Sequence, residues 1–493
     1  MNRQPFFLAA FAVVVAGKVW TIVTFGDLQL GPDTRFVETA HHMLASWNWL
    51  WDAGLEREAI PHSLWKTVGY SALIAALMQL FGDAWLWWLY GIQATMSLIA
   101  GYSVYRLALA LKLGVLISVL TFLLHQWSTP FSTDCLIASN GLDGSLATIV
   151  LSSLGVRFLQ GRPLGAPTMI LYGAIIGFCF LLRLTYEYWG ALFLVMLFLM
   201  LHQKTASLRL AAQSVLIFAL FFVACVAGYK AWNYTRTGHV VTSTGGQTAY
   251  PFSMMRSARL LAPDDPASVI TGDTALDRVV REALGDASKS PYQLANAVNH
   301  TLFVDHGLTA IEIQQEAAAS FWRLVIQNPT GWIVVWLRNG SWLHQSSLFT
   351  GPIRQYDELV WWKDVHAIED YYQGWREEVR AFLETGDPRH LSFEAIVQAG
   401  LRFILRLVGI GLIAALLIGT TVSSWRCLRL GAAAPPPDIL LAAYGWLYFL
   451  TVAMFAVHFV ELRYLSPVIG VAIVAAVAHS ANGCRQAVQW LRR

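Results

Sequence analysis

The sequence has few charged residues for its length. Of its 493 residues, 13% are charged and 56% are hydrophobic, whereas a soluble protein carries about a quarter charged residues. The apolar residues come in blocks, and several blocks reach the roughly 20 residues that a helix needs to cross a bilayer core about 30 Å thick. The shortage of charge therefore argues against a soluble protein and predicts a polytopic integral membrane protein.

The sequence also lacks paired cysteines. None of its 5 cysteines forms a Cys-x-x-Cys pair, and on the topology derived below only Cys135 faces the outside. A disulfide framework and a cysteine-based metal site are therefore not expected. No internal repeat or low-complexity segment is present, and no nucleic-acid partner is expected.

Apolar segments predict an all-α fold with about ten membrane-spanning helices. The first segment reads as a retained span, because it lacks a convincing small-residue cleavage site and more spans follow. Two shorter stretches, 63–81 and 331–343, read as helices lying at the outer interface, where tryptophan is favoured. The predicted spans are residues 5–25, 84–108, 113–131, 144–160, 167–183, 187–203, 211–229, 400–422, 438–458 and 464–481.

Basic residues give the orientation, because cytoplasmic loops are rich in Lys and Arg. With the N-terminus inside, alternate loops carry the basic residues, and Asp438 is the one acid near an inside boundary. Both termini are therefore predicted to be cytoplasmic. The inside residues are Arg3, Arg106, Lys112, Arg157, Arg162, Lys204, Arg209, Arg426, Arg429, Arg485, Arg492 and Arg493.

This topology divides the chain into three parts. Residues 1–229 form an N-terminal transmembrane module with a first outer loop at 26–83, and 399–493 form the C-terminal transmembrane helices. Between the seventh and eighth spans, residues 230–398 form a large outer region. It has helical patterns at Ile311–Gln327 and Asp364–Glu384, and its tryptophans predict that it lies on the membrane surface.

The first outer loop contains a candidate catalytic acid. Gly31 and Pro32 break the chain, and Asp33 is placed to cap a following helix. The positive end of that helix would keep the carboxylate ionised. An N-cap alone is the simpler interpretation of Asp33. The predicted inward face of the helix is Phe36, Ala40, Met43 and Leu44, which recur at helical spacing.

Two further outer segments carry groups that suit an anion. Lys66 follows the acidic first loop, where it would face a lipid phosphate or serve as a snorkelling anchor. The Ser/Thr/Gly stretch 243–247 offers backbone and hydroxyl donors to an anion or sugar, unless it is an ordinary polar loop.

Ionisable residues also lie at two predicted span ends, where a functional role is the default hypothesis. Arg183 and Glu187 flank a helix–helix turn and would bind substrate or pair with each other. Asp143, at the end of the second outer loop, would be a second acid or a cap of the next span. Acids from two loops would suit a divalent ion, although nothing requires one. A zinc site of His41, His42 and His62 is an alternative to solvated interface residues.

Four short motifs occur in a consistent order along the chain. They are Pro32-Asp33 with Phe36 and Met43-Leu44-Ala45-Ser46; Lys66, Gly69-Tyr70 and Phe81-Gly82; Trp232-Asn233-Tyr234 through Gly245-Gly246; and Arg463-Tyr464 with Pro467. In these motifs the chain resembles GT-C superfamily glycosyltransferases. Within this superfamily, the chain resembles the branch that includes protein O-mannosyltransferases and the lipid A aminoarabinose transferase. The resemblance is weakest over residues 255–390.

The resemblance implies an inverting transfer of a sugar from a polyprenyl-phosphate donor. Asp33 matches the base that activates the acceptor hydroxyl. Cations near the leaving phosphate are needed, and Lys66 matches the family's cationic position, with Arg463 and Arg183 as further candidates. The branch usually works without a catalytic metal, so no cofactor is expected. Further candidates for a second acid or for substrate binding are Asp143, Glu187, Asn233 and Tyr464.

The sequence thus favours a glycosyltransferase of a bacterial inner membrane with its active site on the periplasmic face. Its expected partners are the donor, a lipid or glycan acceptor of the envelope, and membrane lipids. One alternative is another glycan-assembly enzyme, a ligase or polymerase using diphosphate-linked donors, with its key residues in a late outer loop. The other alternative is a transporter, for which Lys18 is the one clear charge within a span.

Overall fold

The computed structural model describes residues 4–25, 35–45, 64, 66–128, 136–162, 164–205, 208–345, 365–456 and 465–491. Within these ranges the regular elements are all helices, as predicted. The first half of the chain forms α1 (Gln4–Phe25), α2 (Arg35–Ala45), α4 (Gly69–Phe81), α5 (Trp85–Ala110), α6 (Val115–Gln126), α7 (Asn140–Leu159), α8 (Ala166–Leu182), α9 (Tyr186–Thr205) and α10 (Leu208–Thr237).

The second half begins with the outer region and returns to the membrane. It forms α11 (Gly246–Leu261), α12 (Ala275–Leu284), α13 (Pro291–Val304), α14 (Ala310–Gln327), α15 (Pro329–Gln345), α17 (Val365–Thr385), α18 (Phe393–Leu430), α19 (Pro436–Ala456) and α20 (Ser466–Leu491). The helices predicted at 311–327 and 364–384 are confirmed as α14 and α17.

The protein is an all-α polytopic membrane protein. In the described ranges, 7 segments are long and apolar enough to cross a membrane: α1, the α4–α5 stretch, α7, α10, α18, α19 and α20. The other three predicted spans correspond to the shorter apolar helices α6, α8 and α9. A 12-residue helix such as α6 is about 18 Å long, which is less than the bilayer core.

The stretch predicted as an interfacial helix at 63–81 forms α4, which begins at Gly69. Gly82 follows it with a φ of 53°, a left-handed conformation that glycine adopts readily, so α4 and α5 are separate helices. Gly69 itself packs on the end of α8, because a Cβ there would lie 2.6 Å from the Leu181 carbonyl oxygen. This close approach brings the first outer loop against the α8–α9 turn.

Burial separates the central helices from the peripheral ones. In the most apolar stretch of α7 and of α20, 67% of the residues are buried inside the protein. In α1 and α10 the corresponding share is 17%. Many buried residues of α5, α7, α8, α9, α19 and α20 share one core that includes Phe180, Tyr186 and Tyr444. The exposed apolar side chains of α1, α10 and α18 are therefore available to lipid.

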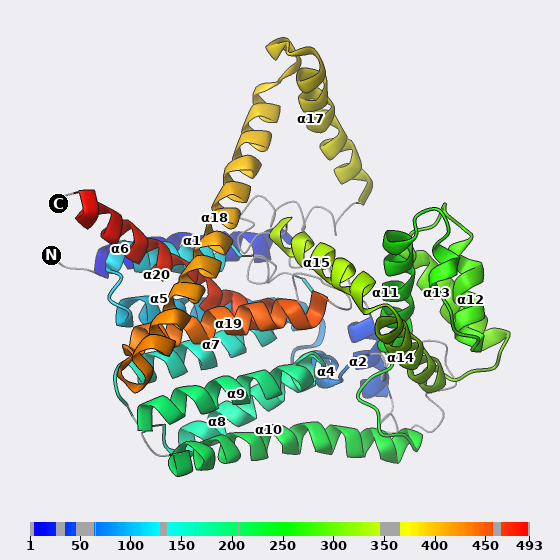
Figure 1. Cartoon of the computed structure of the whole chain (residues 1–493), viewed down its shortest axis with the longest axis horizontal. Coiled ribbons are helices and arrows are strands. Elements are labelled where there is room, and N and C mark those ends of the chain that lie inside the picture. The colour runs from blue at the N-terminus through cyan, green and yellow to red at the C-terminus, as the bar shows by residue number, and fades with distance from the viewer. Residues whose placement is uncertain are drawn as a thin grey trace.

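The two ends of the bundle hold different parts of the chain. The start of α1 and the end of α20 lie at the same end (Figure 1), as two cytoplasmic termini require. Arg485 donates to the Lys112 carbonyl at 3.5 Å, and Arg426 lies 3.8 Å from Asp438, so loops predicted to be inside meet there. The assignment of this end to the cytoplasm rests on the charge pattern.

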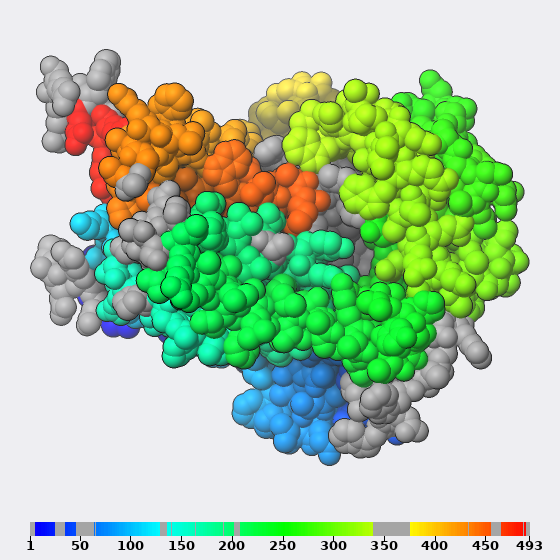
Figure 2. Space-filling view, turned by 60° about the horizontal axis from the view of Figure 1, so that its bottom comes forward, coloured from blue at the N-terminus to red at the C-terminus, as the bar shows by residue number. Residues whose placement is uncertain are grey.

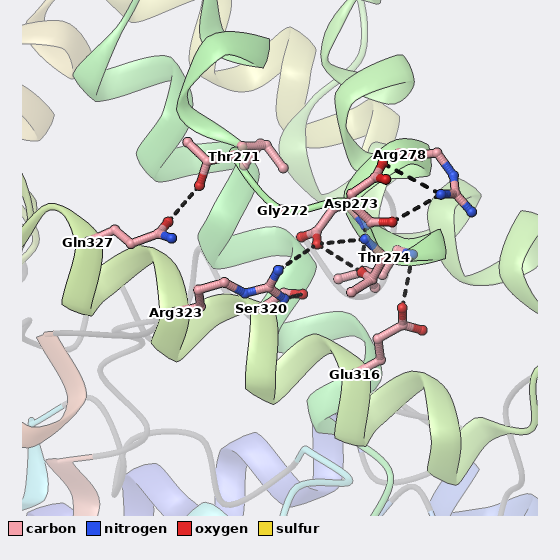
Figure 3. Close-up of polar contacts among 12 residues, drawn as sticks. Thr271, Gly272, Asp273, Thr274, Arg278, Glu316, Ser320, Arg323 and Gln327 are labelled. Atoms are coloured by element: carbon pink, nitrogen blue, oxygen red, sulfur yellow. Dashed lines mark hydrogen bonds and ion pairs between the residues drawn. The ribbon is translucent and has the colours of Figure 1, made fainter.

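The outer region contains a small helical bundle, α11–α14, with a core of its own around Met255, Leu276 and Phe321. Three of its helices begin with capping boxes, at Thr274, Ser290 and Thr309. Figure 3 shows polar contacts between the start of α12 and α14. Local sequence signals of this kind fix helix starts without help from the membrane.

Helix α15 connects the outer region to the transmembrane helices. On α15, Trp332 enters the core of the outer bundle, while Trp336 donates to the Ala453 carbonyl of α19 at 2.9 Å. In Figure 2, α15 in yellow-green lies beside α19 in orange-red. The hairpin of α17 and the start of α18 projects away from the other helices (Figure 1).

The helices extend beyond the expected domain limits. We expected the outer region to begin at residue 230 and to end at 398, but α10 continues to Thr237 and α18 begins at Phe393. Both limits therefore fall inside continuous helices. A helix does not need to stop at the membrane surface, because its backbone hydrogen bonds are satisfied internally on either side.

Candidate functional site

A small pocket lies where α2 meets the segment that leads into α4. It is lined by Arg35, Phe36, Thr39, Lys66, Thr67, Val68 and Ser71, and its volume is about 10 Å³. That is room for roughly one water molecule. The pocket brings two cationic side chains and three hydroxyl groups together at one point.

Helix α2 is held in place by the apolar face that the sequence predicted. Phe36, Ala40 and Met43 are buried, and the Phe36 ring lies 4.9 Å from the Tyr70 ring of α4 in an edge contact. The prediction was wrong for Leu44, which is 40% exposed. It is the penultimate residue of α2.

Lys66 belongs to this pocket. Its ammonium group lies 4.5 Å from the centre of the Phe36 ring, a cation–π contact. The neighbouring Thr67 is 2% exposed, and its hydroxyl group has no hydrogen-bond partner in the part of the chain that the structure describes. A buried hydroxyl left unpaired costs about 1–3 kcal/mol, so Thr67 offers a hydrogen bond to whatever occupies the pocket.

Three residues expected in the glycosyltransferase site lie outside the described residues, namely Asp33, Arg463 and Tyr464, as does His62 of the alternative zinc site. Asp33 precedes Arg35 by two positions in the sequence. Ser466, which follows Arg463 and Tyr464 in the sequence, is among the described residues. It packs against the start of α7, because a Cβ added at Gly144 would lie 2.9 Å from the Cβ of Ser466.

Asp143 forms a second polar centre near the start of α7. The residue is completely buried. Its Oδ1 accepts a hydrogen bond from the Gly144 backbone at 2.6 Å, and its Oδ2 lies 3.7 Å from Arg183. The hydroxyl of Tyr186 donates to the Asp143 carbonyl at 2.9 Å. The acid of the second outer loop and the arginine of the α8–α9 turn therefore meet.

These contacts differ from two of the simpler interpretations of the sequence. Helix α7 begins at Asn140, so Asp143 lies within the helix and is not its N-cap. Glu187 does not pair with Arg183. It accepts hydrogen bonds from Lys230 and, at 3.0 Å, from Thr242, which ties α9 to α10 and to the loop that follows.

Asn233 shapes the loop after α10. It is fully buried, its side chain donates to the Val241 carbonyl at 2.9 Å, and its oxygen accepts from Arg236. Arg236 in turn stacks on Trp232 at 3.8 Å. The Asn233 amide thus holds the turn that leads into the Ser/Thr/Gly loop.

The Ser/Thr/Gly loop lies beside the segment that carries Lys66. The backbone N–H of Thr244 donates to the Leu64 carbonyl at 2.7 Å. Thr244 is buried, and within the described ranges its hydroxyl has no hydrogen-bond partner. Two segments far apart in the sequence, each singled out for anion binding, are therefore neighbours.

Arg35 and Thr67 were not among the site residues predicted from the sequence. Arg35 could have been found from the sequence, since it lies two residues after the candidate base, Asp33, and is the first residue of the helix that follows it. Thr67 could not, because only tertiary packing shows that its hydroxyl is buried. In the described part of the chain, no group of three or more His, Cys, Asp or Glu side chains could hold a metal ion.

Neither a protein-family model nor a curated protein matches the sequence. Solved structures resemble its fold. One is the oligosaccharyltransferase AglB from Archaeoglobus fulgidus in complex with an inhibitory peptide and a dolichol-phosphate, at 13% identity and a TM-score of 0.42 over 96% of this chain. This chain spans 50% of the AglB chain.

The others are structures of ArnT from Cupriavidus metallidurans. The apo state has 16% identity and a TM-score of 0.33 over 95% of this chain and 76% of that one. The form bound to undecaprenyl phosphate has 14% identity and a TM-score of 0.33 over 96% and 77%. A likeness at these TM-scores is too loose to assign an activity or a site residue.

Proposed function

We propose that this protein is an inverting glycosyltransferase. It transfers a sugar from a polyprenyl-phosphate donor to a hydroxyl of a lipid or glycan acceptor, on the periplasmic face of a bacterial inner membrane. The observation that carries the proposal is the pocket shared by Arg35 and Lys66. It lies at the start of the helix that directly follows the candidate base, Asp33.

In the proposed reaction, the acceptor oxygen attacks the anomeric carbon as the bond from that carbon to the phosphate oxygen breaks. Asp33 accepts the proton of the acceptor hydroxyl. The lipid phosphate leaves with an added negative charge. Lys66 and Arg35 stabilise this charge, and they do so more strongly next to the membrane than in water because the local dielectric constant is low.

The size of the pocket limits how the phosphate binds. A space for roughly one water molecule does not hold a phosphate group, so Arg35 and Lys66 must swing outward on their flexible stems. The Phe36 ring under Lys66 and the Thr67 hydroxyl then form the floor. The lipid chain lies in the membrane and needs no room in this pocket.

The other candidate cations take second place in this proposal. Arg183 faces the buried Asp143 carboxylate, so part of its charge is already balanced. Arg463 and Tyr464 keep the role implied by their motif. Glu187 and Asn233 support the loop after α10 through their bonds to Thr242 and Val241.

The transporter alternative rested on Lys18, and the contacts of this residue favour a structural role. Lys18 is 8% exposed and donates to Ser97 at 3.1 Å. Side chains that bind and release a transported ion need access to it. A lysine held inside the bundle by a serine of α5 fits an anchor for α1.

The test compares the lipids that purify with wild-type protein and with Asp33→Asn in mild detergent. A protein without its base still binds the donor through its cations but does not discharge it. We expect mass spectrometry to find a sugar-bearing polyprenyl phosphate enriched in Asp33→Asn. The matched control is Asp52→Asn, which removes another acid of the same outer loop and should resemble wild type.

Two results would count against the proposal. If folded wild-type protein and Asp33→Asn both lack polyprenyl lipids, the donor is wrong. If Asp33→Asn transfers sugar at the wild-type rate, Asp33 is not the base.

A further inference from the structure

Helix α5 carries two polar side chains on a face that is buried in the protein. Gln93 and Ser97 lie one helical turn apart, and both are completely buried. Buried amides within a membrane protein are retained where both their donor and acceptor groups find partners. The partners of Gln93 lie on two different outer segments.

Gln93 binds these segments with opposite ends of its amide. Its Oε1 accepts a hydrogen bond from the Tyr70 hydroxyl of α4 at 2.8 Å. Its Nε2 donates to the Leu136 carbonyl at 3.2 Å. Leu136 lies in the second outer loop, on the segment that leads into α7 and Asp143. One side chain thus connects the two outer loops that carry candidate site residues.

Tyr70 connects Gln93 to the pocket that is lined by Arg35 and Lys66. Tyr70 is fully buried, and its ring meets the edge of the Phe36 ring at 4.9 Å. On Phe36, in turn, the ammonium of Lys66 lies 4.5 Å from the centre of the ring. The position of Lys66 therefore depends on Phe36, that of Phe36 on Tyr70, and that of Tyr70 on Gln93.

We infer that Gln93 is a positioning residue that sets the geometry of the Arg35–Lys66 pocket and fixes it relative to the second outer loop. What the pocket binds rests on the proposed function. The role of Gln93 itself rests on the two hydrogen bonds and on the ring contacts. Glutamine suits this place because one amide both accepts and donates.

The chain offers a matched control in Gln126. This residue is 2% exposed, donates to the Ser97 carbonyl at 2.8 Å and accepts from the Ser97 hydroxyl at 3.3 Å. It is also a buried glutamine bonded within the bundle, but its partner is α5 itself and not α4. If Gln93→Leu acts only by lowering the stability of the protein, Gln126→Leu should change binding and hydrogen exchange in the same way.

The experiment measures binding of undecaprenyl phosphate to purified wild type, Gln93→Leu, Gln93→Glu, Tyr70→Phe and Gln126→Leu. We expect Gln93→Leu to weaken binding about tenfold, since the Tyr70 hydroxyl and the Leu136 carbonyl both lose a buried hydrogen bond. Gln93→Glu keeps the acceptor for Tyr70 and should recover part of the affinity. Tyr70→Phe combined with Gln93→Leu should cost less than the sum of the two single changes.

Hydrogen exchange in α2 gives a second measurement that does not depend on the ligand. Gln93→Leu should speed exchange across Phe36–Met43, and Gln126→Leu should not. If Gln93→Leu changes neither the exchange in α2 nor the binding, or if Gln126→Leu reproduces both effects, the inference is overturned. If wild type itself does not bind the lipid phosphate, the proposed function fails, and exchange in α2 alone decides the role of Gln93.

Discussion

The Asp143 carboxylate lies 3.7 Å from the Arg183 guanidinium, with the acid fully buried and the arginine 11% exposed. The pair joins the start of α7 to the turn between α8 and α9. Ions buried together are expensive to bring out of water, and their mutual attraction offsets this cost only while both are present. The pair is therefore sensitive to loss of one partner.

We predict that Asp143→Ala destabilises the protein by about 3–5 kcal/mol, because Arg183 is left without its counter-charge. The double variant Asp143→Leu/Arg183→Met should be much closer to wild type. Thermal unfolding in detergent, followed by loss of helical signal, measures the difference. Equal melting temperatures for Asp143→Ala and the double variant would show that the pair carries little energy.

The cation pocket gives a second prediction, now on binding. Lys66→Met and Arg35→Met should each weaken binding of undecaprenyl phosphate by roughly 10- to 100-fold, the value of a charge-assisted hydrogen bond of about 1.5–3 kcal/mol. Thr67→Val should have a smaller effect in the same direction. Titration of the purified variants with the lipid measures these changes.

Lys112→Met is the control for this series. It removes a cation at the opposite end of the bundle, where Arg485 contacts the Lys112 carbonyl, so it should leave the affinity unchanged. If all three cation variants weaken binding alike, the attraction comes from net charge and not from the pocket.

Gly272 gives a prediction about the outer bundle. A Cβ at this position would lie 2.0 Å from Asp277 Oδ2 and 2.2 Å from Arg323 Nη1, in the contact region of Figure 3. Gly272→Ala should therefore separate Arg323 from Asp277, which lie 3.2 Å apart. The expected loss is about 1–3 kcal/mol.

Limited proteolysis of α11–α14 measures the effect of Gly272→Ala, which should be cut faster than wild type. Gly285→Ala is the matched control, because its Cβ would come no closer than 3.2 Å to a neighbouring atom, the Glu282 carbonyl oxygen. Equal cleavage of both variants would contradict the prediction.

The helices themselves were largely predictable from the sequence. The outer helix predicted at 311–327 became α14, since Thr309 and Glu312 form a capping box that marks its start. The helix at 364–384 became α17. The limits of α10 and α18 were less predictable, because hydrophobicity indicates where the membrane ends and not where a helix ends.

The candidate site was predictable only in part. The sequence singled out Lys66, Asp143 and Arg183, but as separate groups with alternative roles. It gave no reason to pair Asp143 with Arg183, nor to place Thr244 against Leu64. Such contacts join helices that are distant in the chain, and side-chain periodicity carries no information about which helices are neighbours.

The sequence by itself determined that this is an all-helical membrane protein with a polar outer region, because the bilayer requires long apolar helices whatever their arrangement. It also identified which outer residues carry charge. Only the tertiary structure decided that Arg35 joins Lys66 in one pocket and that Gln93 holds Tyr70 beneath it. The physical reason is that these relationships depend on how helices pack, which is set by the whole bundle and not by any one segment.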